Sequence, residues 1–168
     1  MLSHYDNATL YNDSIVTQIV KRFQKENAIV IYVPDHGEEC YEEDRGFICR
    51  NHAANIDWPL AHYEFEIPFW IYCSPKYIKT HRDIYRQIRA AKDKRFMTDA
   101  LPHLLLYLAG IETPTYKEEY NILSPKYNEM RPRILKNSAD YDQLRDEQLK
   151  KVEKEKSKKE KSKKGDKK

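Results

Sequence analysis

The sequence predicts an α/β fold, in which helices alternate with short buried strands. Two stretches rich in β-branched and aromatic residues, 28–33 (AIVIYV) and 66–73 (EIPFWIYC), have the length of strands. A long amphipathic helix precedes the first stretch, and a leucine-rich helix follows the second. Because helices usually connect parallel strands, the preceding helix favours a parallel sheet for the first strand.

The first helix is predicted at residues 6–26. Apolar side chains recur at helical spacing from Leu10 to Phe23, and charged side chains occupy the other face. Asp6 or Asn7 has the chemistry of an N-cap, because a short polar side chain can accept a hydrogen bond from the first turn.

Prolines delimit both predicted strands. Pro34 ends the first strand, and Pro75 closes the second. Pro68 lies inside the second strand and indicates an edge position or a bulge, since proline cannot donate to a ladder. Residues 37–64, between the strands, show no clear period, and loops of that length in compact domains are usually functional or disordered.

Two helices and a short strand are predicted in the second half of the chain. Residues 81–92 are predicted to be helical in part, and a leucine-rich helix follows at 99–109. Thr98 is the predicted N-cap of that helix and Gly110 its C-cap glycine. A short strand is predicted at 133–135.

Positive charge is concentrated at the C-terminal end of the chain. Residues 150–168 contain 11 Lys against three Glu and one Asp, a net charge of +7, whereas the whole chain carries +3 and residues 1–149 therefore −4. The sequence predicts a domain at 1–147 and a disordered Lys-rich tail at 148–168. Near a membrane such a tail would favour anionic lipid head groups. The domain lacks the basic face that nucleic-acid binding requires, so no nucleic-acid partner is predicted.

No signal for membrane insertion or export is present in the sequence. It contains no apolar run of about 18 residues, the length of a membrane span, and its first residues lack the pattern of a signal peptide. If the complete protein is exported or membrane-bound, we expect those instructions to lie outside this chain.

Asp35 and His36 directly follow the first predicted strand. Open α/β sheets bind ligands at the C-terminal ends of their strands. A carboxylate and an imidazole suit Zn²⁺ or Mn²⁺, and Gly37 would let the chain turn so that both side chains reach one ion. By itself the pair also fits an exposed turn with a capping aspartate.

The cysteines do not determine the cellular compartment. Cys40, Cys49 and Cys73 include no C-x-x-C pair, which excludes a structural zinc site of that kind. Cys40 and Cys49 either bridge a loop in an oxidising compartment or are free thiols like Cys73.

The residues around the Asp-His pair resemble the phosphoethanolamine transferases of the alkaline phosphatase and sulfatase superfamily. Residues 5–13 (YDNATLYND) and 29–39 (IVIYVPDHGEE) are similar to the family's "YDN…LY.D" helix and to its strand ending in "SDHGES". The match continues in order through 66–71 (EIPFWI), the 96–111 helix with its "LAGI" turn, and 121–123 (NIL). It covers about residues 4–136.

The resemblance implies a three-layer α/β/α sandwich of the alkaline phosphatase and sulfatase type, of which this chain is the C-terminal portion. It implies that Asp35 and His36 are metal ligands, for Zn²⁺ with Mn²⁺ as the other candidate. It also implies a catalytic histidine near the metal and the phosphoryl group, for which His52 is the candidate. His52 follows His36 by 16 residues, more than is usual in the family, and Ala53 replaces a frequent glycine. His62 is the less favoured substitute.

For the complete enzyme, the resemblance implies transfer of phosphoethanolamine from phosphatidylethanolamine to lipid A or a related glycan. It implies an inner-membrane protein with a periplasmic catalytic domain. The family's nucleophile is a metal-activated Thr. Thr9 and Thr17 lie within the first predicted helix and are interpreted as helix surface, so no nucleophile is assigned and the isolated chain is expected to be inactive.

Two other interpretations remain open at this stage. The chain could be a non-catalytic remnant or a partner-binding fragment that keeps the second half of the fold. It could also come from a sulfatase or a phosphoglycerol transferase of the same superfamily. In either form, the N-terminal half of the catalytic domain is the expected partner, and a sheet without that half has an open edge that favours self-association.

Overall fold

The computed structural model describes residues 2–42, 45–50 and 55–165, and the chain divides into two compact units. The first unit contains Met1–Pro34 and Pro68–Arg131, and the second contains Asp35–Ile67 and Pro132–Lys168. The residues between the two strands of the first unit therefore fold as part of the second.

An antiparallel pair of strands forms the sheet of the first unit. β1 (Ile29–Tyr32) pairs with β4 (Trp70–Cys73) in a register that places Ile31 opposite Ile71. The predicted parallel arrangement is therefore wrong for this pair. A parallel pair needs a crossover connection between its strands, whereas the helix used for the prediction precedes β1. Pro68 lies outside the ladder, two residues before β4.

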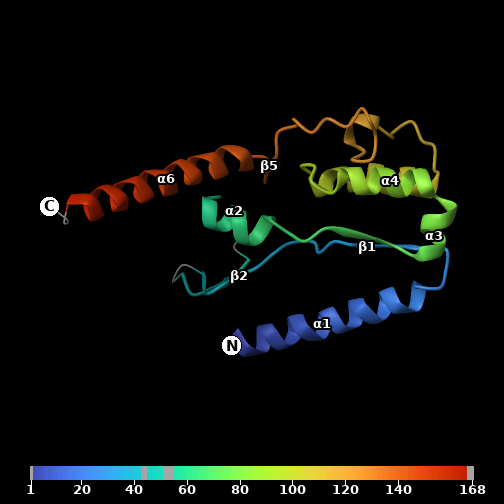
Figure 1. Cartoon of the computed structure of the whole chain (residues 1–168), viewed down its shortest axis with the longest axis horizontal. Coiled ribbons are helices and arrows are strands. Elements are labelled where there is room, and N and C mark those ends of the chain that lie inside the picture. The colour runs from blue at the N-terminus through green and yellow to red at the C-terminus, as the bar shows by residue number, and fades with distance from the viewer. Residues whose placement is uncertain (1, 43–44, 51–54, 166–168) are drawn as a thin grey trace. The chain divides into compact units, whose positions relative to one another are not determined.

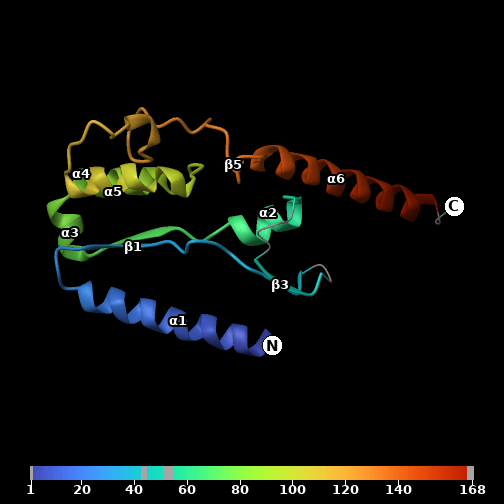
Figure 2. The same cartoon turned by 180° about the vertical axis from the view of Figure 1, so that it is seen from behind.

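Helices cover both faces of this strand pair. Figures 1 and 2 show α1 (Leu2–Phe23) along one side of the β1–β4 pair and α4 (Arg82–Ala91) with α5 (Leu101–Ala109) on the other. Ile71 of β4 packs against the core that contains Leu104 of α5. On the opposite face, Tyr32 stacks on Trp70 with ring centroids 5.2 Å apart. The first unit thus has a helix–sheet–helix layering, which agrees with the predicted α/β class.

The first helix starts earlier than predicted. It begins at Leu2 and ends at Phe23, so Asp6 and Asn7 lie inside it and do not cap it. Val16 and Val20 are half-buried, whereas a stripe of apolar side chains on the same helix remains exposed. The members of this stripe are Tyr11, Ile15, Ile19 and Phe23.

Ser74 joins the end of β4 to the residues just before β1. Its side chain is fully buried, and its Oγ accepts a hydrogen bond from the N–H of Tyr77 at 3.1 Å, which caps α3 (Pro75–Thr80). The same Oγ accepts from the N–H of Ala28 at 3.3 Å and donates to the carbonyl of Glu26 at 2.6 Å. One hydroxyl therefore satisfies backbone groups from two distant segments.

The leucine-rich helix is confirmed at its C-terminal end and differs at its start. Gly110 ends α5 in the left-handed conformation, with φ of 66°. At the other end a 3₁₀ turn, η2 (Thr98–Ala100), precedes Leu101, so the N-cap position of α5 is occupied by Ala100 and not by Thr98. A second 3₁₀ turn, η3 (Glu118–Tyr120), lies in the following loop.

That loop is held by an ion pair with two parallel hydrogen bonds. Arg131 donates from Nη1 and Nη2 to the two carboxylate oxygens of Asp99, each at 2.6 Å. The guanidinium also lies 4.6 Å from the centroid of the Tyr120 ring. The hydrogen bond from Arg131 is the main cause that lowers the pKa of Asp99 below its ordinary value.

In its described residues, the second unit contains the hairpins β2–β3 and β5–β6 and the helices α2 and α6. β2 (Glu39–Cys40) pairs with β3 (Phe47–Cys49), and β5 (Ile134–Leu135) pairs with β6 (Ala139–Asp140). β5 lies within the predicted strand. Ala61, Leu135 and Tyr141 form the buried core of this unit.

A helix occupies part of the segment that was predicted to be irregular. α2 (Trp58–Phe65) is capped by Asp57, whose Oδ1 accepts a hydrogen bond from the N–H of Leu60 at 3.0 Å. A proline in its first turn is compatible with the helix, because the first N–H groups have no partner within the helix. The side chain of Leu60 is completely buried.

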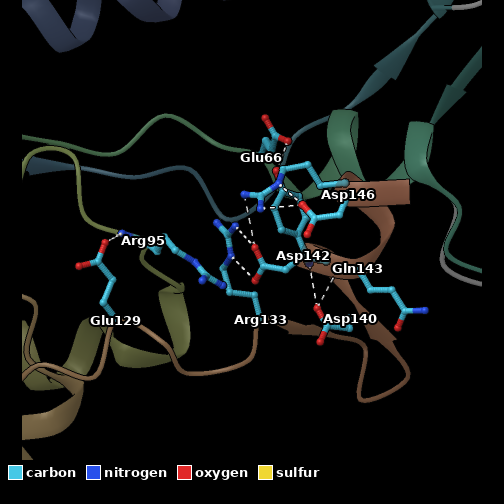
Figure 3. A network of polar contacts seen from close by, with 10 residues as sticks. Glu66, Arg95, Glu129, Arg133, Asp140, Asp142, Gln143 and Asp146 are labelled. Atoms are coloured by element: carbon cyan, nitrogen blue, oxygen red, sulfur yellow. Dashed lines mark hydrogen bonds and ion pairs between the residues drawn. The ribbon is translucent and has the colours of Figure 1, made fainter. Parts of the chain in front are cut away.

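The last helix is fixed to the second unit at its first turn. Figure 3 shows Asp140 beside Gln143 and Asp142 facing Arg133. Asp140 accepts from the N–H groups of Asp142 at 2.9 Å and Gln143 at 3.2 Å, which makes it the N-cap of α6 (Tyr141–Gly165). Arg133 donates to both carboxylate oxygens of Asp142, at 3.1 and 2.6 Å.

Tyr141 and Glu66 make a second polar contact in the same region. The phenol of Tyr141 donates to Glu66, and His62 Nδ1 lies 3.0 Å from the same carboxylate oxygen. Burial, followed by the contact with Glu66, raises the pKa of Tyr141 to about 12. This contact ties the end of α2 to the start of α6.

The helix of α6 extends into the predicted disordered tail. The prediction placed a domain at 1–147 and a disordered segment at 148–168, whereas the structure has helix as far as Gly165. Lysine and glutamate are good helix formers, and pairs such as Glu147 and Lys151 lie four residues apart, which supports a helix without a buried core. None of the helices in the described part of the chain is long and apolar enough to cross a membrane.

Candidate metal centre

Asp35 and His36 follow β1 and lie together in the second unit. His36 Nδ1 is 2.8 Å from the carbonyl oxygen of Gly37. A carbonyl has no hydrogen to give, so Nδ1 must be the donor, and in the neutral ring the lone pair is on Nε2. Nε2 lies 3.5 Å from Asp35 Oδ2. Two acceptor atoms from neighbouring residues are therefore close together.

This separation fits a shared metal ion. Zinc binds imidazole nitrogen and carboxylate oxygen at about 2.0–2.2 Å, and tetrahedral geometry then places two ligand atoms about 3.4 Å apart. The side chain of Asp35 is 88% exposed and the side chain of His36 is 27% exposed, so neither of them is fully buried. The donor set and its spacing are those of one edge of a zinc site.

Gly37 places this pair directly against α2. Its N–H donates to the carbonyl of Glu64 at 2.9 Å. A Cβ built on Gly37 would lie 2.2 Å from the carbonyl oxygen of Tyr63, a distance that real Cβ atoms essentially never show. The glycine was predicted to permit a turn, but it does not adopt a positive φ. The structure gives a different reason for it, which is the close approach of two backbones.

The two glutamates that follow lie in different environments. Glu38 accepts a weak hydrogen bond from the Cys49 thiol at 3.6 Å. Glu39 is fully buried, and its Oε1 lies 2.5 Å from Arg45 Nε. Arg45 also donates from Nη1 to Asp57 at 2.9 Å. The guanidinium thus links the strand after the Asp-His pair to the cap of α2.

Comparisons with known proteins give the family. A family model described as sulfatase matches residues 1–111. The chain belongs to the sulfatase family. The matched residues include Asp35 and His36 and both strands of the first unit.

Two curated relatives of this sulfatase-family chain are phosphoethanolamine transferases. Phosphoethanolamine transferase EptC of Escherichia coli is 32% identical over 128 residues, which cover 74% of this chain and 21% of that protein. The Kdo(2)-lipid A phosphoethanolamine 7''-transferase of Escherichia coli is 28% identical over 98 residues, which cover 56% of this chain and 16% of that protein. The chain therefore spans about a fifth of the length of EptC.

Solved structures of the same type of domain share the fold. The crystal structure of the C-terminal periplasmic domain of EptC from Escherichia coli matches with a TM-score of 0.66 and 31% identity, covering 83% of this chain and 40% of that one. The crystal structure of the same domain in complex with Zn matches with the same TM-score and identity, and the match covers 83% of this chain and 39% of that one. The predicted α/β fold of the sulfatase type is confirmed by these matches.

The other predicted site residues of the sulfatase-family chain are less well defined. His52 lies outside the described residues. His62 stacks on Trp58 with centroids 5.4 Å apart, and its Nδ1 lies against Glu66. Thr9 and Thr17 are exposed on α1, as predicted for helix surface.

The described residues hold no complete metal site. Within residues 2–42, 45–50 and 55–165, no group of three or more His, Cys, Asp or Glu side chains is arranged to hold a metal ion. Cys40, Cys49 and Cys73 are not joined by disulfides in the described part of the chain. In this part of the sulfatase-family chain, Asp35 and His36 therefore form a pair of candidate ligands and not a closed site.

Replacing Arg45 with alanine is expected to destabilise the second unit by about 3 kcal/mol at pH 7, because a buried carboxylate loses its partner. Burial already raises the pKa of Glu39 more than Arg45 lowers it. A raised folded-state pKa means that folding binds protons, so stability falls as pH rises above the ordinary value of Glu. Without Arg45 this fall extends to higher pH, and urea unfolding should show a smaller loss at pH 5 than at pH 7.

Two variants control this measurement. Arg86→Ala removes an arginine that pairs with Asp83 at the surface, and it should cost less than about 1 kcal/mol. Adding Glu39→Gln to Arg45→Ala removes the buried charge and should restore part of the lost stability. A double variant that is no more stable than Arg45→Ala would show that the buried charge is not the cause.

Proposed function

We propose that this chain supplies Asp35 and His36 as two zinc ligands of a phosphoethanolamine transferase of the sulfatase family. The observation that carries the proposal is the 3.5 Å separation of His36 Nε2 and Asp35 Oδ2, with Nδ1 held by the Gly37 carbonyl. A histidine ligand usually donates its other ring nitrogen to a carbonyl or carboxylate, which fixes the tautomer. The Gly37 carbonyl fulfils that role here.

Zinc is favoured over manganese as the ion. Imidazole with carboxylate suits zinc in a tetrahedral site, whereas manganese favours oxygen-rich octahedral sites. A solved relative with 31% identity is described as a complex with Zn. When bound, the ion would act as a Lewis acid that lowers the pKa of a hydroxyl nucleophile and offsets charge on phosphoryl oxygens.

The residues of this chain have distinct roles in the proposal. Asp35 and His36 hold and orient the ion, and the backbone contact of Gly37 with α2 keeps both in place. His52 would donate a hydrogen bond to a phosphoryl oxygen or carry a proton. The remaining ligands and the threonine nucleophile would come from other parts of the complete protein. The isolated chain is therefore proposed to be inactive.

The substrates follow from the relatives. One relative is named for transfer of phosphoethanolamine to Kdo(2)-lipid A, and several others are named phosphoethanolamine transferases. For the complete protein we propose phosphatidylethanolamine as the donor and a lipid A-type glycan phosphate as the acceptor. Diacylglycerol would be the product that leaves. The related solved domain is periplasmic, which supports a periplasmic catalytic domain on an inner-membrane protein.

Chelation of zinc from the complete protein is expected to stop transfer, because the nucleophile would then keep the pKa of an ordinary hydroxyl. The measurement is release of diacylglycerol from labelled phosphatidylethanolamine with lipid A present, after dialysis against a chelator. Adding back Zn²⁺ should restore release. Equal activity before and after chelation, with metal content shown to be zero, would refute the zinc assignment.

The donor is tested separately in the same assay. Phosphatidylglycerol is offered in place of phosphatidylethanolamine, since a phosphoglycerol transferase of the same superfamily would use it. If zinc-dependent release of diacylglycerol occurs with phosphatidylglycerol and not with phosphatidylethanolamine, the proposed donor is refuted and the proposed metal site is not.

A further inference from the structure

The last helix of the chain has two different faces. Tyr141, Leu144, Gln148 and Val152 are buried or half-buried and recur every three or four residues. They form the side of α6 that packs on its own unit, where Tyr141 and Leu144 belong to the core. From Leu149 to Lys158, every residue of the helix is exposed except Val152.

A row of lysines follows the opposite side of the helix. Lys150, Lys154 and Lys158 are all exposed and lie four residues apart, so their side chains fall on one face. At about 100° per residue this row is centred roughly 130° around the helix from the packing side. A shallow groove lined by all three lysines, with Glu153 and Ser157, marks their common surface.

This row is unfavourable for the helix itself. Like charges four residues apart destabilise a helix, and three lysines in succession give two such pairs. Elsewhere on α6 the spacing gives mixed pairs, such as Lys151 with Glu155. An anionic surface in contact with the row would remove the repulsion. Within the groove, Glu153 is the acidic side chain beside the row, and it leaves the three lysines with a net positive charge.

We propose that the row of Lys150, Lys154 and Lys158 binds the surface of a bilayer that contains anionic phospholipids. The row has no apolar neighbour that could insert into a membrane, so binding is electrostatic and stays at the head groups. Residues 1–149 carry a net charge of −4, which opposes wrapping of the unit by a nucleic acid. The preference for a bilayer also rests on the proposed function, whose donor and acceptor are both membrane lipids.

The test uses the full chain and vesicles, and it needs no catalysis. Partitioning is measured by co-sedimentation on vesicles of phosphatidylcholine mixed with phosphatidylglycerol, and on phosphatidylcholine alone. The chain should bind only the mixed vesicles. It should be released near 1 M salt, where the Debye length is about 3 Å. Failure of this test leaves the zinc and transfer assays unaffected, so the two proposals can fail independently.

Two charge-swap variants distinguish binding by the row of lysines from binding by the net charge of the helix. Lys154→Glu with Glu155→Lys keeps the composition and breaks the row, and it should weaken partitioning at least about fivefold. Glu155→Lys with Lys156→Glu keeps the composition and leaves the row intact, and it should change partitioning less than about twofold. Circular dichroism checks that both variants keep the helix.

Three results would overturn the proposal. The first is equal partitioning of the two swap variants, which would reduce the effect to net charge. The second is equal binding to both kinds of vesicle. The third is binding of a short DNA duplex more tightly than mixed vesicles with the same sensitivity to the Lys154 swap, which would assign the row to a nucleic acid.

Discussion

Asp35→Ala in the complete enzyme is expected to lower turnover by more than about 100-fold. Loss of a group that only supports a metal ligand typically costs 10–100-fold in activity or metal affinity, and loss of a ligand itself should cost at least as much. Protein zinc sites use three or four protein ligands, so the site would lose one ligand of a small set and keep only His36 and the ligands from other parts of the protein. Turnover is measured as diacylglycerol release, and zinc content by mass spectrometry of the purified protein.

An exposed carboxylate elsewhere provides the matched control for this substitution. The side chain of Asp93 is 84% exposed, close to the 88% of Asp35, and it pairs with Lys92 at the surface. Asp93→Ala should therefore leave turnover and zinc content unchanged. Retention of more than about a tenth of wild-type turnover in Asp35→Ala, at full expression, would count against the ligand role.

Gly37→Ala is expected to have the second largest effect. The added methyl would lie 2.2 Å from the carbonyl oxygen of Tyr63, so the loop or the end of α2 must move. A displacement of about 1 Å at a reacting group can cost about 100-fold in rate. We expect turnover to fall by between 10- and 100-fold and zinc affinity to fall with it, measured by competition with a chromophoric chelator.

Gly110 provides the control for Gly37. A side chain at Gly110 would strain the backbone but would not clash with any neighbouring atom. It has a φ of 66° in the first unit, and a Cβ there would meet nothing within 4 Å. Gly110→Ala should lower stability by about 1 kcal/mol and leave turnover unchanged. If Gly37→Ala loses stability but keeps full zinc affinity, the backbone contact holds the fold and does not position the metal ligands.

The strands of the first unit could be found from the sequence, but not their direction. Composition and flanking prolines are local signals, and both strands appear close to the predicted ranges. Their relative direction depends on the path of residues 35–67, which fold in the second unit. Nothing local to either strand records that path. The prediction of a parallel sheet was therefore wrong for β1 and β4, because strand direction depends on residues far from both strands.

The sequence at the start of α2 contains an N-cap pattern that was not used in the prediction. Asp57, followed by Trp58-Pro59, has the pattern of an N-cap with a proline in the first turn. The helix has only eight residues, too few for a clear apolar period, so the segment was predicted to be irregular. The Lys-rich end was misjudged for the opposite reason. Its composition signals disorder, although its lysines and glutamates are also good helix formers.

The candidate site was only partly visible in the sequence. The adjacency of Asp35 and His36 at a strand end could be seen directly, and the structure places the two polar atoms near each other. The buried pair of Glu39 and Arg45 could not be seen, because it exists only when the β2–β3 hairpin closes. The role of Gly37 also required the position of α2, which the sequence did not reveal.

The anchoring of Ser74 gives the strand pair a fixed alignment. Slipping β1 along β4 by one residue would move its exit point by about 3.3 Å and turn every side chain to the opposite face. It would also break the hydrogen bonds of Ala28 and Glu26 with the Ser74 hydroxyl. That hydroxyl is fully buried, so water could not replace the lost partners. If Asp35 and His36 bind one ion, as we propose, the residue at which β1 ends must be fixed accurately. One small buried residue, 39 positions after Asp35 in the chain, sets that stopping point.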